Sequence, residues 1–113
     1  MAKVIITKSL EEEINKKFKQ ESIEIFSLMH TLEDNPKKGK EIGNVGNIII
    51  KELKYNKFRF YFLTDGYKIK FLKIEELKDL IIKFVRMSDK KSQQNVIEDI
   101  KRVLRNIGEG GFK

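Results

Sequence analysis

The residues best suited to chemistry lie in one stretch of the sequence, from Lys51 to Gly66. This stretch, KELKYNKFRFYFLTDG, carries four cationic side chains, five aromatic rings and two acidic residues. Ammonium and guanidinium groups bind phosphate oxygens through charge-assisted hydrogen bonds, so the stretch could hold a phosphate chain. The same pattern is also typical of a half-buried strand with a basic outer face, and both interpretations stay open here.

The composition limits the chemistry to a few functional groups. The chain has no cysteine and a single histidine, His30. Disulfides, thiol catalysis and the usual histidine or cysteine metal clusters are therefore excluded. We expect no metal and no cofactor, and any catalysis must use lysine, arginine, carboxylate or hydroxyl groups.

The net charge of +7 is concentrated in the later part of the chain. Residues 1–36 carry five basic and seven acidic side chains, whereas residues 37–113 carry nineteen basic and ten acidic ones. A positive field of this kind attracts polyanions and is expected of a nucleic-acid-binding protein. Lysine-rich surfaces are also common in other proteins, so charge alone does not decide between these functions.

The length of the chain is that of one ordinary domain. No linker, repeat or low-complexity segment divides it, so we expect a single domain over residues 1–113. No apolar run is long enough to cross a membrane, and the opening MAKVIITKSLEEE has too short an apolar stretch for a signal peptide. These features predict a cytoplasmic protein without membrane contact.

The first third of the chain predicts a strand followed by helices. KVIIT is a β-branched run, and Ser9 and Glu12 have the spacing of a capping box at a helix start. Apolar residues then recur at helical spacing over 10–18 and again over 23–32, but the two stripes differ in phase. This mismatch predicts a bend or break near residues 20–22, and the glycine-rich segment 37–47 predicts a loop.

The rest of the chain predicts strands and then one helix. The strand runs, rich in β-branched and aromatic residues, are 48–53, 58–64, 68–74 and 80–87. Short turns at 55–57 and at Asp65-Gly66 indicate antiparallel hairpins. Apolar residues from Val96 to Ile107 recur at helical spacing, and Gly108 follows where a C-terminal cap belongs.

The predicted fold class is therefore α+β. An N-terminal strand and a helix pair pack on one face of a mainly antiparallel sheet, and a C-terminal helix ends the chain. The other face is expected to be open to solvent. Because side chains alternate along a strand, Phe58, Phe60 and Phe62 should enter the core, whereas Arg59 and Tyr61 should lie on the opposite face.

Three segments resemble the RelE/ParE toxin superfamily of toxin–antitoxin systems. LEDNPKKGKEIG is similar to the family's Asn-Pro and Gly-Lys approach to the sheet, and IKELKYNKFRFYFL is similar to its hairpin with an aromatic-arginine strand. MSDKKSQQNVIEDIKRVL is similar to the segment that leads into the last helix of HigB-type members. The resemblance spans nearly the whole chain and implies a RelE-like fold.

The resemblance implies a metal-independent endoribonuclease that cuts mRNA at the ribosome and is silenced by a small antitoxin protein. In such enzymes the 2′-hydroxyl of the RNA attacks the adjacent phosphate, which needs a base, an acid and cations. Arg59 matches the family's strand arginine, and its planar fork can hold two phosphate oxygens. The candidate catalytic residues are Arg59, Lys54, Arg86 and Tyr61, and the candidate RNA-binding residues are Lys51, Lys57, Lys83, Lys90 and Lys91.

The sequence also departs from the family pattern. Glu52 stands two positions before Lys54, where RelE-type members carry a second lysine, and the family's C-terminal tyrosine and catalytic histidines have no counterpart. Tyr61 could substitute for them. These departures favour an alternative, a noncatalytic RelE/ParE-fold module that binds nucleic acid or gyrase.

A third reading is an interaction domain whose lysines only protect strand edges and whose sheet accepts a partner strand. The sequence leaves the oligomeric state open, between a dimer and a toxin–antitoxin heteromer.

Overall fold

A five-stranded sheet is the central element of the structure, a computed structural model that describes residues 1–113. Single turns of 3-10 helix separate several of the larger elements. In chain order, the strands and α-helices are β1 (Lys3–Ile6), α1 (Lys8–Phe18), α2 (Ser22–His30), β2 (Lys40–Val45), β3 (Ile48–Tyr55), β4 (Phe58–Asp65), α3 (Gly66–Phe71), β5 (Ile81–Asp89) and α4 (Gln93–Asn106).

The strands lie in the order β1-β5-β4-β3-β2. β1 pairs with β5 in parallel, and the other neighbours are antiparallel. With helices before, within and after this mainly antiparallel sheet, the fold class is α+β and the prediction is confirmed. No helix is long and apolar enough to span a membrane.

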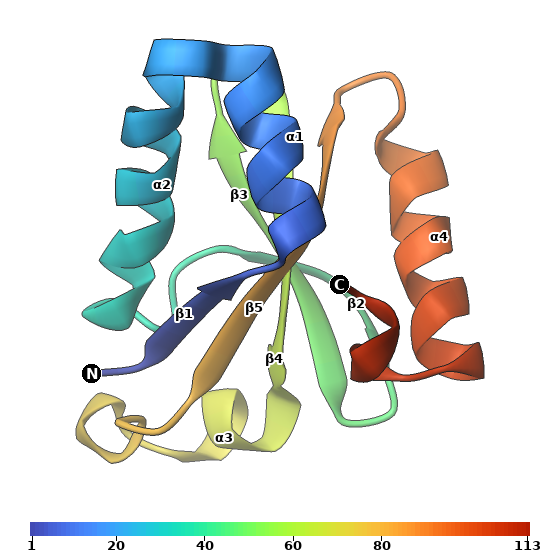
Figure 1. Cartoon of the computed structure of the whole chain (residues 1–113). Helices are drawn as coiled ribbons and strands as arrows, with labels where there is room; N and C mark the ends of the chain where they lie inside the picture. The colour runs from blue at the N-terminus through green and yellow to red at the C-terminus, as the bar shows by residue number, and fades with distance from the viewer.

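Helices cover both faces of the sheet (Figure 1). On one face, Leu10 and Ile14 of α1 and Ile25 of α2 pack with Phe60 and Phe62 of β4. On the other face, α4 packs on a second cluster of buried residues: Ile50, Tyr61, Leu63, Val85, Ile97, Ile100, Leu104 and Phe112. The expectation that one face would be open to solvent is therefore wrong. The residues of β4 and β5 on this second face include apolar ones, and α4 packs against them.

The helix pair forms largely as predicted, with a different N-cap. The hydroxyl of Thr7, and not that of Ser9, caps α1 by accepting a hydrogen bond from the Leu10 amide at 3.3 Å. Lys19 has a positive φ of 53°, and a turn of 3-10 helix over Lys19–Glu21 separates α1 from α2. The predicted break between the two apolar stripes is confirmed.

Two predicted elements are wrong. The segment expected to be a loop contains the edge strand β2, and the strand expected over 68–74 is instead α3 followed by a short 3-10 turn. The Asp65-Gly66 pair does not form a hairpin turn, because Asp65 Oδ1 accepts from the Lys68 amide and caps α3. The chain thus leaves the sheet after β4, at the opposite end from the β3–β4 turn (Figure 1).

Candidate nucleic-acid interface

A pocket of about 470 Å³ lies at the end of the sheet where the β3–β4 turn approaches the loop between β5 and α4. Both chain segments are at the top of the view in Figure 1. We call this site the basic pocket. Its lining contains no hydrophobic residue and consists of Lys54, Asn56, Lys57, Arg59, Asp89, Lys90 and Lys91.

The β3–β4 hairpin sets the floor of the basic pocket. Asn56 adopts a positive φ of 53°, which lets the chain turn tightly between the strands. The resulting register places Lys54 directly opposite Arg59. Two like charges in this arrangement repel each other and destabilise the hairpin. The presence of two cations at these positions is therefore better explained by the binding of an anion between them than by a contribution to the stability of the fold.

Arg59 is incompletely hydrogen-bonded. Its Nη1 donates to the Lys57 carbonyl at 3.3 Å, but its buried Nε has no partner. A buried donor without a partner is uncommon and costly, because it has lost its water without a replacement. None of the five basic residues of the pocket takes part in the four ion pairs of the structure, so their charge is available to a ligand.

The second wall of the basic pocket comes from the end of β5. Asp89 Oδ1 accepts hydrogen bonds from the amide and the hydroxyl of Ser92, both at 2.8 Å, which fixes the turn that carries Lys90 and Lys91. The Ser92 amide is the main cause of a lowered Asp89 pKa, so this carboxylate is ionised at neutral pH. Asp89 was not among the candidate site residues, although its place directly before two lysines was a usable signal.

The structure brings together five of the nine candidate residues, namely Lys54, Lys57, Arg59, Lys90 and Lys91. Tyr61 is on the same face of β4 as Arg59, but α4 covers it completely. Its hydroxyl is 2.6 Å from the Ser88 Oγ, and burial raises its pKa. Tyr61 is thus a packing residue beneath α4 and does not line the basic pocket.

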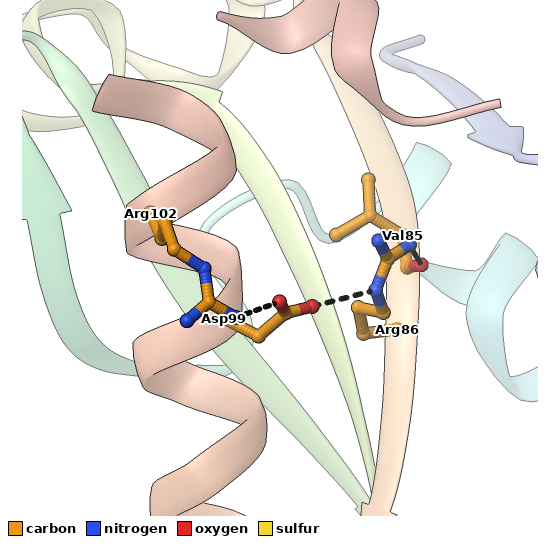
Figure 2. Close-up of polar contacts among 4 residues, drawn as sticks. All are labelled: Val85, Arg86, Asp99 and Arg102. Carbon is orange, nitrogen blue, oxygen red and sulfur yellow. Dashed lines mark hydrogen bonds and ion pairs between the residues drawn. The ribbon is translucent and has the colours of Figure 1, made fainter. Parts of the chain in front are cut away.

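Arg86 also lies outside the basic pocket. Its Nε donates to Asp99 of α4 at 3.4 Å, and its Nη1 donates to the Val85 carbonyl at 2.9 Å. Figure 2 shows Asp99 between Arg86 and Arg102, with its carboxylate shared by the two guanidinium groups. The ring of Phe112 covers the Arg86 guanidinium at 4.9 Å, so Arg86 ties α4 and the C-terminal segment to the sheet.

Lys51 and Lys83 have structural partners. Lys51 is buried on the α1 and α2 side, where its Nζ donates to the Lys37 carbonyl at 2.9 Å and burial lowers its pKa. Its position three residues before Lys54 puts it on the opposite face of β3. Lys83 Nζ donates to the Glu109 carbonyl at 3.0 Å, which holds the C-terminal segment.

Glu52, the departure from the RelE-type lysine pattern, is bonded to α4. It lies half-buried under the first turn of α4, where its Oε2 accepts from Gln93 Nε2 at 3.4 Å. It does not line the pocket, and its hydrogen bond ties α4 to β3.

The fold and the site define a small α+β protein with a cationic, largely polar pocket at one end of its sheet. No group of three or more histidine, cysteine, aspartate or glutamate residues is arranged to hold a metal ion. No family model, curated protein or solved structure matches the chain. The function is therefore argued from the geometry of the basic pocket.

Proposed function

We propose that this protein is a RelE-like toxin that binds single-stranded RNA through its phosphates in the basic pocket and cleaves it. The observation that carries the proposal is the convergence of five cations from the β3–β4 hairpin and the β5–α4 loop, with Arg59 Nε buried and unpartnered. Such a cluster costs stability without a ligand and suits a polyanion. The substrate proposed from the family resemblance is mRNA at the ribosome, with a small antitoxin protein as the inhibitory partner.

In the proposed reaction, the 2′-hydroxyl attacks the adjacent phosphorus and gives its proton to Asp89, the only carboxylate that lines the pocket. Arg59 and Lys54 stabilise the negative charge that builds on the phosphate oxygens. The bond from phosphorus to the 5′ oxygen breaks, and the ammonium group of one of the lysines that line the pocket protonates that oxygen. The products are a 2′,3′-cyclic phosphate and a free 5′ hydroxyl. The proposed reaction uses only side chains of the protein and the RNA itself.

Expression of the protein alone, followed by mapping of transcript ends by primer extension, tests the cleavage. New RNA ends and arrested growth are expected for the native sequence, and neither is expected for Arg59→Ala. Arg105→Ala is the matched control, because Arg105 is exposed near the end of α4 and lies outside the pocket. Normal growth without new ends, for native protein and Arg59→Ala alike, would contradict the nuclease proposal.

A second function, RNA binding without cleavage, is favoured by the burial of Tyr61, because Asp89 is then the only candidate base in the pocket, and its lowered pKa makes it a weak one. Asp89→Asn separates the two functions, since asparagine still accepts the Ser92 hydrogen bonds but cannot take a proton. If Asp89 is the base, cleavage falls by about 10²-fold or more while RNA affinity is kept.

Noncatalytic binding predicts RNA affinity without cleavage in both Asp89→Asn and the native protein. In either case, log affinity for single strands should fall by about 0.7 per neutralised phosphate for each tenfold rise in salt. Affinity that is weak and insensitive to salt would contradict both functions and favour a plain interaction domain.

A further inference from the structure

Three large apolar side chains are exposed at the end of the sheet opposite to the basic pocket. Tyr67 and Phe71 of α3 are 59% and 70% exposed, and Ile74 in the following turn is 56% exposed. α3 lies at the bottom of the view in Figure 1, a full strand length from the β3–β4 turn. We call Tyr67 and Phe71, which line one hollow together, the aromatic surface.

The two rings border a hollow of about 260 Å³. Tyr67 and Phe71 pack together with their centroids 5.1 Å apart, and Ile49 of β3 also lines the hollow. The other side comes from Asn44 near the end of β2 and from Asn47 in the turn between β2 and β3. A hollow with aromatic walls accepts an apolar side chain, because burying that side chain removes apolar surface from water on both sides.

Hydrogen bonds fix the backbone at the start of α3, next to the aromatic surface. Asn47 accepts from the Gly66 amide through its carbonyl at 2.7 Å and from the Tyr67 amide through its Oδ1 at 3.0 Å. Asn47 Nδ2 donates to Asp65 Oδ1 at 3.0 Å. A Cβ on Gly66 would lie 2.8 Å from the Asn47 carbonyl oxygen, so only glycine fits this close approach. The backbone that carries Tyr67 is therefore fixed before a ligand binds, which lowers the entropy cost of binding.

The hollow itself carries one positive charge and no negative one, because Lys70 is the only charged residue that lines it. Lys70 forms no ion pair. The acidic residues of the neighbouring segments, among them Asp65, Glu75 and Glu76, do not line the hollow. The chain as a whole carries a net charge of +7, so an approaching acidic segment meets attraction both locally and at long range.

We propose that the aromatic surface binds an acidic segment of a partner protein, which inserts one bulky apolar side chain between Tyr67 and Asn44 and places a carboxylate against Lys70. A phosphate chain is disfavoured, because the hollow is lined by one cation whereas the basic pocket has five. A two-fold contact with a second copy is disfavoured as well, because it would bring the two Lys70 side chains together.

Chemical-shift mapping of backbone amides with synthetic peptides tests this proposal. The probe is a short peptide in which glutamates surround a central Leu-Trp-Leu. One control peptide replaces the glutamates with lysines, and the other replaces Leu-Trp-Leu with serines. We expect the probe to shift the amides of residues 66–74 and of Asn47, and both control peptides to leave them unchanged.

Variants of the aromatic surface give the second readout. Phe71→Ser and Lys70→Glu should each weaken binding of the probe by about tenfold or more, as for a central anchor and its charged neighbour. Both side chains are exposed, so neither change should unfold the protein. The control is Ile107→Ser, which removes an equally exposed apolar side chain after α4.

The proposal is overturned if the lysine peptide shifts the same amides as the probe. It is also overturned if the probe leaves residues 66–74 and Asn47 unshifted or shifts only residues of the basic pocket. A single-stranded oligonucleotide that shifts residues 66–74 would assign this surface to nucleic acid instead. The proposal is independent of RNA cleavage: Phe71→Ser should leave cleavage unchanged, and failure of the peptide experiment leaves the basic pocket unaffected.

Discussion

Lys54 and Arg59 face each other across the β3–β4 hairpin at the floor of the basic pocket. If the pair serves a ligand, removal of one charge should improve stability while weakening binding. We predict that Lys54→Thr raises the free energy of unfolding by about 0.2 to 1 kcal/mol. The neutral threonine removes the repulsion between Lys54 and Arg59, and its β-branched side chain favours a strand. Urea denaturation measures this change.

The same variant should lose affinity for single-stranded RNA, and the slope of log affinity against log salt should fall by about 0.7. Lys16→Thr, on an exposed position of α1, is the control for a general loss of charge. If Lys54→Thr changes neither RNA affinity nor stability, Lys54 neither repels Arg59 measurably nor contributes to RNA binding.

Tyr61 provides a test of packing against catalysis. Its hydroxyl is hydrogen-bonded to Ser88 in the buried interface under α4. We predict that Tyr61→Phe destabilises the protein by about 1 kcal/mol, because the buried Ser88 hydroxyl loses its partner, and leaves RNA cleavage unchanged. Denaturation and primer extension on the same preparation check both parts, and a variant that folds normally but no longer cleaves would return Tyr61 to the catalytic residues.

Part of the site could be predicted from residue spacing, and part could not. Alternation of side chains along β4 placed Arg59 and Tyr61 on one face, as found. Applied to β3, the same rule places Lys51 and Lys54 on opposite faces of the sheet. The sequence could not reveal that α4 would cover Tyr61 but stop short of Arg59, because helix docking is set by tertiary packing.

The β-bulge in β5 is another feature that alternation could not predict. The register shifts so that Tyr61 pairs with Arg86 while Phe62 pairs with Phe84, and Val85 is the extra residue. As a result Met87 enters the same core cluster as Phe84, and Arg86 turns toward Asp99 of α4. Simple alternation from Phe84 would have placed Arg86 on the opposite face.

At the scale of elements, α3 depends on its N-cap. Asp65 Oδ1 accepts from the Lys68 amide, which is the main cause of the lowered Asp65 pKa. Because the folded state binds the Asp65 proton less well than the unfolded chain, the cap contributes stability above about pH 4, and this contribution is lost as the pH falls below it. Asp65→Ala should cost about 1 kcal/mol at neutral pH and reduce the loss of stability on acidification.

Thermal unfolding of Asp65→Ala and the native protein between neutral pH and pH 3 checks this prediction. Amide exchange of residues 66–71 should also become faster in the variant. Equal acid sensitivity of the two proteins would show that the cap does not contribute. The same cap explains why the strand expected at 68–74 was wrong: the apolar and β-branched residues there favour a strand, but Asp65 and the tight Gly66 contact with Asn47 start a helix.

The C-terminal segment is an anchor for α4. Phe112 is buried among Ile97, Ile100 and Leu104 and covers the Arg86 guanidinium. Phe112→Ala should therefore destabilise the protein by about 3 kcal/mol through the cavity that it leaves. The midpoint of urea denaturation measures the loss, with Ile107→Ala as an exposed control. A change of less than about 0.5 kcal/mol would mean that the segment contributes little to the packing of α4.

At the scale of the whole molecule, the basic pocket and the aromatic surface are separate sites. The basic pocket lies at one end of the strands and the aromatic surface at the other, so two ligands can bind the same chain without overlap. The composition predicted the positive field, and periodicity predicted most of the layers. The position of the exposed rings depended on α3, which the sequence pattern did not predict, and so the second surface could be found only in the structure.

The parallel pairing of β1 with β5 has a consequence for synthesis of the protein. Residues 3–6 find their strand partner only at residues 81–84, and the Ser9 amide is bonded to the carbonyl of the last residue, Lys113. Contacts between distant parts of a chain form slowly, and a nascent chain grows by roughly 5 to 20 residues per second. The apolar faces of α1 and α2 are therefore fully covered only after β5 has been synthesised. The basic pocket needs residues 54–59 and 89–91 together, so a nascent chain that has not reached residue 91 cannot carry the proposed activity.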